Sequence, residues 1–187
     1  MHVIKVTHGF DNRGRLFDPS GNLVDWWGNA STVEFSARSQ CFRDEYSAFS
    51  IHGHQLNGLI TLGENIADNG GVRVSYAAYE AWRKTGGIPL EGASTGGAAI
   101  TGEAVTGTDE ILPGLDMSHE QQYFLAVAQI WCGSATQQRV YQDILTNPHT
   151  YRRYRVNGML QNIPEFARAF GCAGSAALNP TKKCSLW

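Results

Sequence analysis

Two carboxylates stand four residues apart in the segment Glu64-Asn65-Ile66-Ala67-Asp68. On an α-helix this spacing places both side chains on one face. One carboxylate can then bind a metal ion while the other supports a neighbouring ligand. Exposed helix faces also carry such pairs, because charged side chains are mostly solvated. The pair alone is therefore compatible with a metal site and with an ordinary solvated surface.

A histidine and an arginine six residues apart, His149 and Arg155, form a second group. A hydrogen-bonding side chain and a cation can together stabilise an oxyanion that develops in a reaction. Loop residues that follow a proline, here Pro148, are also common on protein surfaces. Both interpretations of this group stay open on the residues alone.

Two further patterns favour simpler interpretations. His52-Gly53-His54 has the spacing of a metal-binding pair on a strand, but no third ligand accompanies it, which favours loop histidines. The glycine-rich run 95–107 lacks the Gly-Lys-Ser/Thr ending of a phosphate-binding loop. Nucleotide binding is therefore unsupported.

The four cysteines, at Cys41, Cys132, Cys172 and Cys184, show no close spacing. A cysteine zinc site or a thioredoxin-like motif is poorly supported by this pattern. Disulfides are the better interpretation, and three pairings are possible by count alone.

Five short sequence motifs occur in this order along the chain: THGFD from Thr7, ENIADNGG from Glu64, LPGLD from Leu112, WCG from Trp131 and the terminal NPTKKCSLW. With these motifs the chain resembles, from about Val6 to Trp187, the C-terminal catalytic region of the neprilysin and endothelin-converting-enzyme family of zinc metalloendopeptidases. The resemblance implies a mainly α fold with minor β structure, a fragment of a thermolysin-like (gluzincin) catalytic domain.

In that family an HExxH helix supplies two zinc-binding histidines and a glutamate base, and ENIAD supplies the third ligand. The resemblance implies that His8 and Glu64 bind zinc and that Asp11 and Asp68 orient the histidines. Three protein ligands leave one zinc position open for a water molecule.

The chain departs from the HExxH pattern at its first two residues. With His8 in the last position, the first histidine falls at Ile4 and the glutamate at Lys5. Isoleucine has no lone pair for zinc, and lysine cannot act as a carboxylate base. We therefore expect the chain as given to be inactive as a peptidase.

The resemblance also assigns the substrate-binding residues. His149 matches the histidine that stabilises the transition state, and Arg155 matches the arginine that binds a substrate carbonyl. The acidic partner expected two residues before the histidine is here Asn147. Ile130 and Trp131 match part of an apolar pocket for a substrate side chain, and they can also be ordinary helix core.

The family pattern pairs the cysteine of the SQC segment with the one near the C-terminus, which implies a Cys41–Cys184 disulfide. The partners of Cys132 and Cys172 would lie in an upstream part of family members. We expect these two thiols to be free unless they pair with each other.

The first half of the chain must position the carboxylates and His8. Residues 8–29 predict a loop with a short hairpin, and Ser31 with Glu34 three residues on has the spacing of a capping box. We expect a second helix over 62–84 that Gly70 and Gly71 disturb, because glycine in a helix interior is costly. Residues 86–114 are rich in small residues and predict a long flexible loop.

The second half carries three predicted helices. Ser118 and Gln121 form a capping box before a helix that runs to Trp131. A short helix is predicted over 137–145. Pro164 suits the first turn of a final helix through residue 170, with Gly171 as its C-cap.

Length and composition limit the alternatives. The 187 residues, with 42% hydrophobic side chains, are expected to form one domain, and the net charge of -2 argues against a nucleic-acid partner. No window reaches the roughly 18 apolar residues of a membrane span, and the start does not have the pattern of a secretory signal. By resemblance, the location is extracellular or at the cell surface.

Three functional hypotheses remain. The chain is part of a zinc endopeptidase of oligopeptides whose N-terminal lobe and first zinc histidine lie upstream, a non-catalytic peptide-binding or regulatory relative, or a gene-model fragment. The abrupt start of the family pattern at Val6 favours a truncated or alternative start over gradual divergence.

Overall fold

The computed structural model describes residues 7–84 and 114–187. All but the last residue of the predicted loop 86–114 lie outside these ranges, as do Ile4 and Lys5. The described part is mainly helical with one two-stranded sheet, which confirms the predicted fold class. Within the described ranges no helix combines the length and the apolar character that a membrane span requires.

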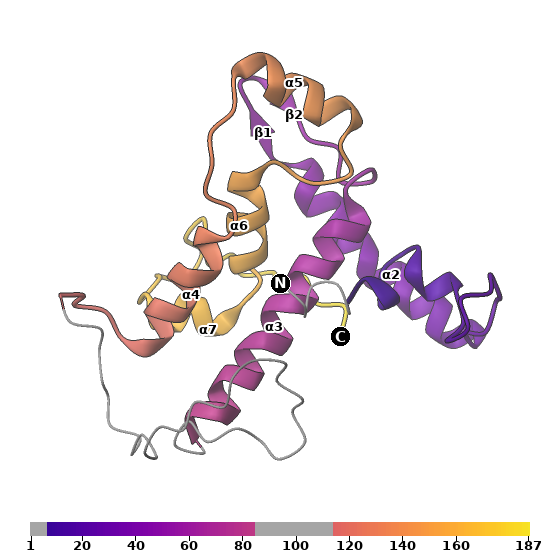
Figure 1. The fold of residues 1–187 in the computed structure, drawn as a ribbon, viewed down its shortest axis with the longest axis horizontal. Coiled ribbons are helices and arrows are strands. Elements are labelled where there is room, and N and C mark those ends of the chain that lie inside the picture. The colour runs from indigo at the N-terminus through magenta and orange to yellow at the C-terminus, as the bar shows by residue number, and fades with distance from the viewer. Residues whose placement is uncertain (1–6, 85–113) are drawn as a thin grey trace, which may run out of the picture.

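Helix α3 (Leu62–Lys84) runs through the middle of the molecule, and α2, α4, α6 and α7 pack around it (Figure 1). It is continuous, so the predicted disturbance at Gly70 and Gly71 is wrong. Both glycines are buried and lie in the stretch of α3 that the neighbouring elements cover. A side chain at Gly70 would meet Thr7 and Trp187, so the missing side chain lets these residues approach the helix.

Helix α2 (Asn29–Ser47) begins earlier than the sequence predicted. Its N-cap is Gly28 and Ser31 lies within the first turn, so the predicted capping box does not form. Thr32 already donates its backbone N–H to the Gly28 carbonyl, which places the helix start before Ser31. Phe35, Phe42 and Tyr46 are buried on the inner face of α2, whereas Val33 is 61% exposed and lies outside the core.

The segment before α2 contains two short 3-10 helices, η1 (His8–Phe10) and η2 (Gly14–Leu16). The predicted hairpin is reduced to one antiparallel bridge between Phe17 and Leu23. Asp18 closes the turn by accepting backbone N–H groups of Ser20 and Asn22.

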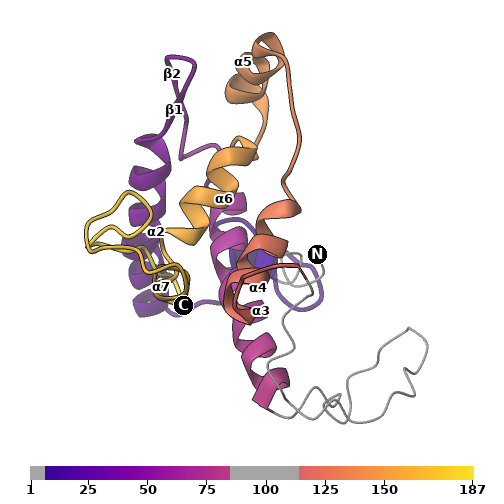
Figure 2. The same ribbon diagram turned by 90° about the vertical axis from the view of Figure 1, so that its left-hand side faces the viewer.

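One end of the molecule is formed by the hairpin of β1 (Ser50–Ile51) and β2 (His54–Gln55) together with α5 (Gln137–Thr146) (Figure 2). The ring centroids of His54 and Tyr141 are 4.8 Å apart, which joins the two elements. His52 has a positive φ of 51° in the turn, whereas His54 is on β2.

The remaining helices are α4 (His119–Gln129), α6 (Arg152–Leu160) and α7 (Pro164–Ala169). Both hydrogen bonds of the predicted capping box at Ser118 are present, but α4 ends before Trp131. Gly171 has a positive φ of 60° just after the C-cap of α7, Phe170. Helix α6 was not among the helices predicted from the sequence.

Two hydrophobic clusters share α3. The first joins α2, the start of α3 and the C-terminal segment, and contains Phe42, Tyr46 and Ile66. The second joins the later part of α3 to α4, α6 and α7 through Phe124 and Met159. The boundary between the clusters is polar, because buried Asn69 donates to the Tyr46 hydroxyl at 3.0 Å.

The Cys41–Cys184 disulfide joins α2 to the C-terminal segment across 143 positions of sequence, with the two Cα atoms 5.6 Å apart. Cys132 and Cys172 are free, and Cys132 is exposed.

Candidate metal and substrate site

Three side chains from separate segments converge on one carboxylate oxygen of Glu64. His149 Nε2 lies 3.1 Å, Arg155 Nη2 3.4 Å and His8 Nε2 3.5 Å from Glu64 Oε2. Glu64 is in the first turn of α3 and only 18% of its side chain is exposed. The structure thus brings together four of the residues that the sequence analysis singled out.

Asp11 orients His8. Its Oδ2 atom lies 2.7 Å from His8 Nδ1, which leaves the other ring nitrogen directed at Glu64. The second oxygen of Asp11 accepts the backbone N–H groups of Arg13 and Gly14 at 2.7 and 2.8 Å. Asp11 is 5% exposed, so these bonds hold both the carboxylate and the imidazole in place.

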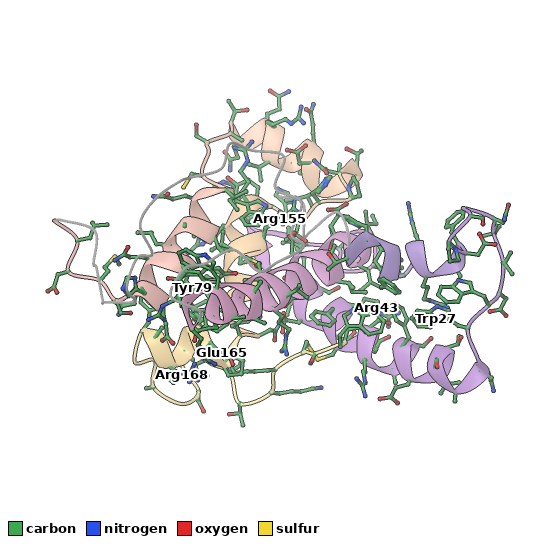
Figure 3. The ribbon with its side chains drawn as sticks, turned by 60° about the horizontal axis from the view of Figure 1, so that its bottom comes forward. Trp27, Arg43, Tyr79, Arg155, Glu165 and Arg168 are labelled. Atoms are coloured by element: carbon green, nitrogen blue, oxygen red, sulfur yellow. A yellow bond between two sulfur atoms is a disulfide. The ribbon has the colours of Figure 1, made fainter. Side chains whose placement is uncertain are left out.

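Asp68 holds Arg155 rather than a histidine among the described residues. Arg155 donates from Nε to Asp68 Oδ2 and from Nη2 to Asp68 Oδ1, both at 2.7 Å. This is a bidentate pair, which fixes the plane of the guanidinium. The position of the first histidine of the HExxH pattern is Ile4, which lies outside the described residues. Figure 3 places Arg155 over α3.

Burial and charge act in opposite directions on this pair. Burial is the largest influence on the pKa of Asp68 and raises it, while the Arg155 guanidinium acts to lower it. Burial disfavours the Arg155 cation, but the hydrogen bonds and charge of Asp68 outweigh it and raise the pKa of Arg155. Arg155 therefore stays a cation while it is held by Asp68.

Asn147 takes the place of the expected acid beside His149. Its Oδ1 atom accepts the backbone N–H of His149 and lies 2.9 Å from His149 Nδ1. Because an amide oxygen can only accept, Nδ1 is the donor and Nε2 is left facing Glu64. A neutral amide thus orients the ring without adding negative charge.

A buried polar link that the sequence analysis did not predict joins α3 to the segment of His149. Thr150 donates to Asn65 Oδ1 at 2.6 Å, and Asn65 donates to the Thr61 hydroxyl at 2.9 Å. Thr150 and Asn65 are sequence neighbours of His149 and Glu64, so the link fixes the distance between those two side chains. In the sequence, the only indication of this link is that a polar residue directly follows each of His149 and Glu64.

A cleft of about 850 Å³, called here the central cleft, opens beside this convergence. Its lining includes Trp131, Asp143, His149, Tyr151 and Arg155. The Arg155 guanidinium lies 5.4 Å from the Trp131 ring centroid, a cation–π distance.

Ile130, the second expected pocket residue, is 53% exposed and does not line the central cleft. It is the C-cap of α4, where the chain turns away from the helix.

The described donors match two zinc ligands and no more. Two ligands on one tetrahedral zinc ion stand roughly 3.2–3.5 Å apart when each bond is about 2.0–2.2 Å. The 3.5 Å between His8 Nε2 and Glu64 Oε2 agrees with that separation. However, within residues 7–84 and 114–187 no group of three His, Cys, Asp or Glu side chains is arranged to hold a metal ion.

Comparison with known proteins decides the family. The sequence model of peptidase family M13 matches residues 2–186. The chain belongs to peptidase family M13. Human membrane metallo-endopeptidase-like 1 is 42% identical over 186 residues, and human neprilysin is 40% identical. Each match covers 98% of this chain, which confirms the predicted resemblance.

The match covers only part of each M13 relative. The chain spans 21% of membrane metallo-endopeptidase-like 1 and 22% of neprilysin, about a fifth of their length. Human endothelin-converting enzyme 1 is 37% identical, with 98% of this chain and 21% of that protein covered.

Solved structures support the fold of this M13 chain. The zinc metalloprotease Zmp1 of Mycobacterium tuberculosis, in complex with an inhibitor, matches with a TM-score of 0.78 and 28% identity, over 99% of this chain and 26% of its own. The Haemonchus galactose-containing glycoprotein complex matches with a TM-score of 0.80 and 34% identity, over 98% of this chain and 28% of its own. The fold is that of an M13 catalytic fragment.

Proposed function

We propose that this chain supplies one side of the active site of a neprilysin-like zinc metalloendopeptidase that cleaves oligopeptides. His8 and Glu64 would be two of the zinc ligands, and His149 and Arg155 would bind the peptide. The observation that carries the proposal is the convergence of three nitrogen-bearing side chains on Glu64, beside the central cleft. When bound, zinc would supply an open coordination position at which water becomes a better nucleophile.

The chain's own residues would orient the peptide. Arg155 is held flat by Asp68 and against Trp131, so its cationic edge can donate to a peptide carbonyl in the central cleft without reorganising. His149, with Nδ1 bound to Asn147, directs Nε2 to the side where negative charge would develop. Trp131 supplies an apolar wall for a neighbouring side chain.

Hydrolysis needs a third ligand and a base, for which the matching positions carry Ile4 and Lys5. We therefore propose that the 187-residue chain has no zinc-dependent peptidase activity. The same residues favour a second candidate function, a non-catalytic relative that binds peptides in the central cleft. The two candidate functions predict different results for substitutions at positions 4 and 5. The endopeptidase should regain peptide cleavage, whereas the non-catalytic relative should not.

Zinc stoichiometry tests the metal assignment. The double variant Ile4→His with Lys5→Glu rebuilds the HExxH pattern around His8, so we expect it to retain about one zinc per chain after dialysis. The unmodified chain should lose its zinc. Adding Glu64→Gln to the double variant should abolish retention, whereas Glu34→Gln on the exposed face of α2 should not.

The result separates the candidates. Chelator-sensitive cleavage of a short peptide by the double variant would support the endopeptidase. Zinc retention that does not depend on Glu64 would show that the assigned ligand is wrong. Peptide binding without cleavage in the double variant would leave the non-catalytic relative as the better description.

We also propose an extracellular or cell-surface location for the whole protein. The supporting observation in this chain is the Cys41–Cys184 disulfide, because such bonds persist mainly in oxidising compartments.

A further inference from the structure

A second cleft, of about 640 Å³, adjoins the central cleft. We call it the arginine cleft, and it lies among the turn of the β1–β2 hairpin, the end of α4 and the start of α6. Trp131, Tyr151 and Arg152 line both clefts, so these side chains form the ridge between them. A volume of this size is in the range of small-ligand sites.

The charges of the arginine cleft have one sign. Arg152 and Arg153 line it together with His52, and none of its lining residues is an aspartate or a glutamate. The acid on the central-cleft side, Asp143, already pairs with Arg139 at 3.1 Å. Two arginine side chains therefore contribute positive charge to the lining of the arginine cleft.

The local backbone positions Arg152. Its Nη1 atom donates to the Ser134 carbonyl at 3.2 Å, and its guanidinium lies against Gly133. A Cβ atom at Gly133 would overlap that guanidinium, so glycine is what allows the close approach. One acceptor uses only part of the five-donor fork, which leaves donors for a ligand.

Part of the lining of the arginine cleft is apolar. Ile51, Trp131 and Val156 contribute hydrophobic surface beside the two arginines. A suitable ligand therefore carries an anionic group next to an apolar one. A planar carboxylate matches the geometry of a guanidinium fork.

We infer that the arginine cleft binds a peptide carboxylate, with an apolar side chain of the same peptide against Ile51, Trp131 and Val156. The carboxylate comes from the peptide C-terminus or from an acidic side chain. The inference rests on the proposed function in taking a peptide as the ligand, but it requires neither zinc nor hydrolysis.

The free thiol of Cys132 lines this cleft and serves as a local reporter. In a Cys172→Ser background it is the one cysteine outside the disulfide. The rate of its alkylation by N-ethylmaleimide, a neutral reagent, is measured by mass spectrometry with chelator present. The probes are N-acetyl-Leu-Phe, its C-terminal amide and N-acetyl-Glu-Phe-amide.

We expect a carboxylate-bearing probe to slow alkylation at a concentration at least about tenfold below that of the neutral amide, the factor that corresponds to about 1.4 kcal/mol. Slowing by N-acetyl-Leu-Phe identifies the C-terminal carboxylate, and slowing by N-acetyl-Glu-Phe-amide identifies the side chain. Arg152→Ala and Arg153→Ala should each reduce the tenfold preference to less than about threefold.

The matched control is Arg43→Ala on α2. This variant also removes one positive charge, but at a position distant from Arg155 (Figure 3). It should leave the preference unchanged. Equal protection by the neutral amide and the carboxylate probes, or no protection by any probe, would overturn the inference. Because chelator is present throughout, either outcome leaves the zinc assignment of His8 and Glu64 to its own test.

Discussion

At the scale of single residues, the candidate site depends on the ion pair between the buried carboxylate of Asp68 and the guanidinium of Arg155. Asp68 is fully buried and uses both oxygens on Arg155, which in turn lies 3.4 Å from Glu64. Removing one member of a buried ion pair leaves the charge of the other buried and without a counter-charge. The pair therefore contributes to the stability of the fold.

Asp68→Asn is expected to lower the free energy of unfolding by about 3 kcal/mol, because the amide turns a donor toward Arg155 and removes the compensating charge. Urea denaturation measures the loss. The control, Glu34→Gln, breaks the exposed Arg38–Glu34 pair and should cost at most about 1 kcal/mol. Equal losses in the two variants would show that the Asp68 pair contributes no more than a surface contact.

Glu45 gives a pH-dependent prediction. Burial raises its pKa, against the opposing effects of hydrogen bonds from Gln161 and Asn162 and the charge of Lys183. With the folded-state pKa above the unfolded value, its favourable contribution is present below the unfolded pKa. That contribution is lost as pH rises through the folded pKa.

Glu45→Gln never ionises and keeps an oxygen acceptor for Asn162. We therefore expect the variant to match the parent chain near pH 3.5 and to be the more stable of the two at pH 7. Urea unfolding across this range measures the difference. If the variant became less stable than the parent chain as the pH rises, the pKa of Glu45 would not be raised by folding, and the prediction would be wrong.

At the scale of elements, α6 carries Arg155 to the site and needs close contact with α2 to do so. A Cβ atom at Gly158 would stand 2.8 Å from ring atoms of Tyr46, which is fully buried. The Phe49 and Tyr154 rings stack 4.4 Å apart at the same junction. The position of α6, and with it that of Arg155, depends on this contact.

Gly158→Ala should therefore destabilise the fold by about 1–2 kcal/mol, since overpacking costs more than the gain in helix propensity. Thermal unfolding and circular dichroism measure the effect. Gly174→Ala is the control, because nothing lies within 4 Å of a Cβ there. If Gly158→Ala were as stable as the parent chain, α6 would have room to shift, and the position of Arg155 would not depend on this contact.

At the scale of the whole molecule, two hydrophobic clusters share one long helix, and a disulfide closes the first of them. Cys184 is 2% exposed and its backbone N–H donates to Asn162 Oδ1 at 2.7 Å. The C-terminal segment is thereby held both to α2 by the disulfide and to the polar boundary between the clusters. Arg38 adds a bond to the Leu186 carbonyl.

The double variant Cys41→Ser with Cys184→Ser should lose roughly 4–5 kcal/mol of stability, because the bond closes a long loop in the unfolded chain. Guanidinium unfolding gives the loss, and thiol counting of the denatured parent chain should find two free cysteines. Cys132→Ser, at an exposed position, should change stability by no more than about 0.5 kcal/mol. A parent chain with four free thiols under oxidising conditions would contradict the assigned bond.

Local patterns in the sequence determined what depends on neighbours along the chain. The spacing of Glu64 and Asp68 places both on α3, and the predicted bounds of that helix are those observed. The capping box at Ser118 also forms, because its atoms lie within one turn. The family motifs identified the M13 membership for the same reason, since each motif is contiguous.

Helix α6, which was not predicted, nevertheless has the local pattern of an amphipathic helix. Val156, Met159, Leu160 and Ile163 have the i, i+3, i+4, i+7 spacing of an amphipathic helix. The helix has no side-chain cap, and Gly158 lies in its last turns, which obscured the pattern. At Ser31 the opposite happened, because a cap pattern was present two positions after Asn29, the residue at which the helix begins.

Tertiary structure alone decided which residues meet. Arg155 pairs with Asp68 across 87 positions, and Thr150 bonds Asn65 across 85. Such partners are chosen by the packing of α6 and the His149 segment against α3, which no local spacing encodes. For the same reason the arginine cleft could not be predicted, because its ridge and walls come from the β1–β2 hairpin, the end of α4 and the start of α6. The sequence names the chemical groups, and long-range packing sets the distances at which they act.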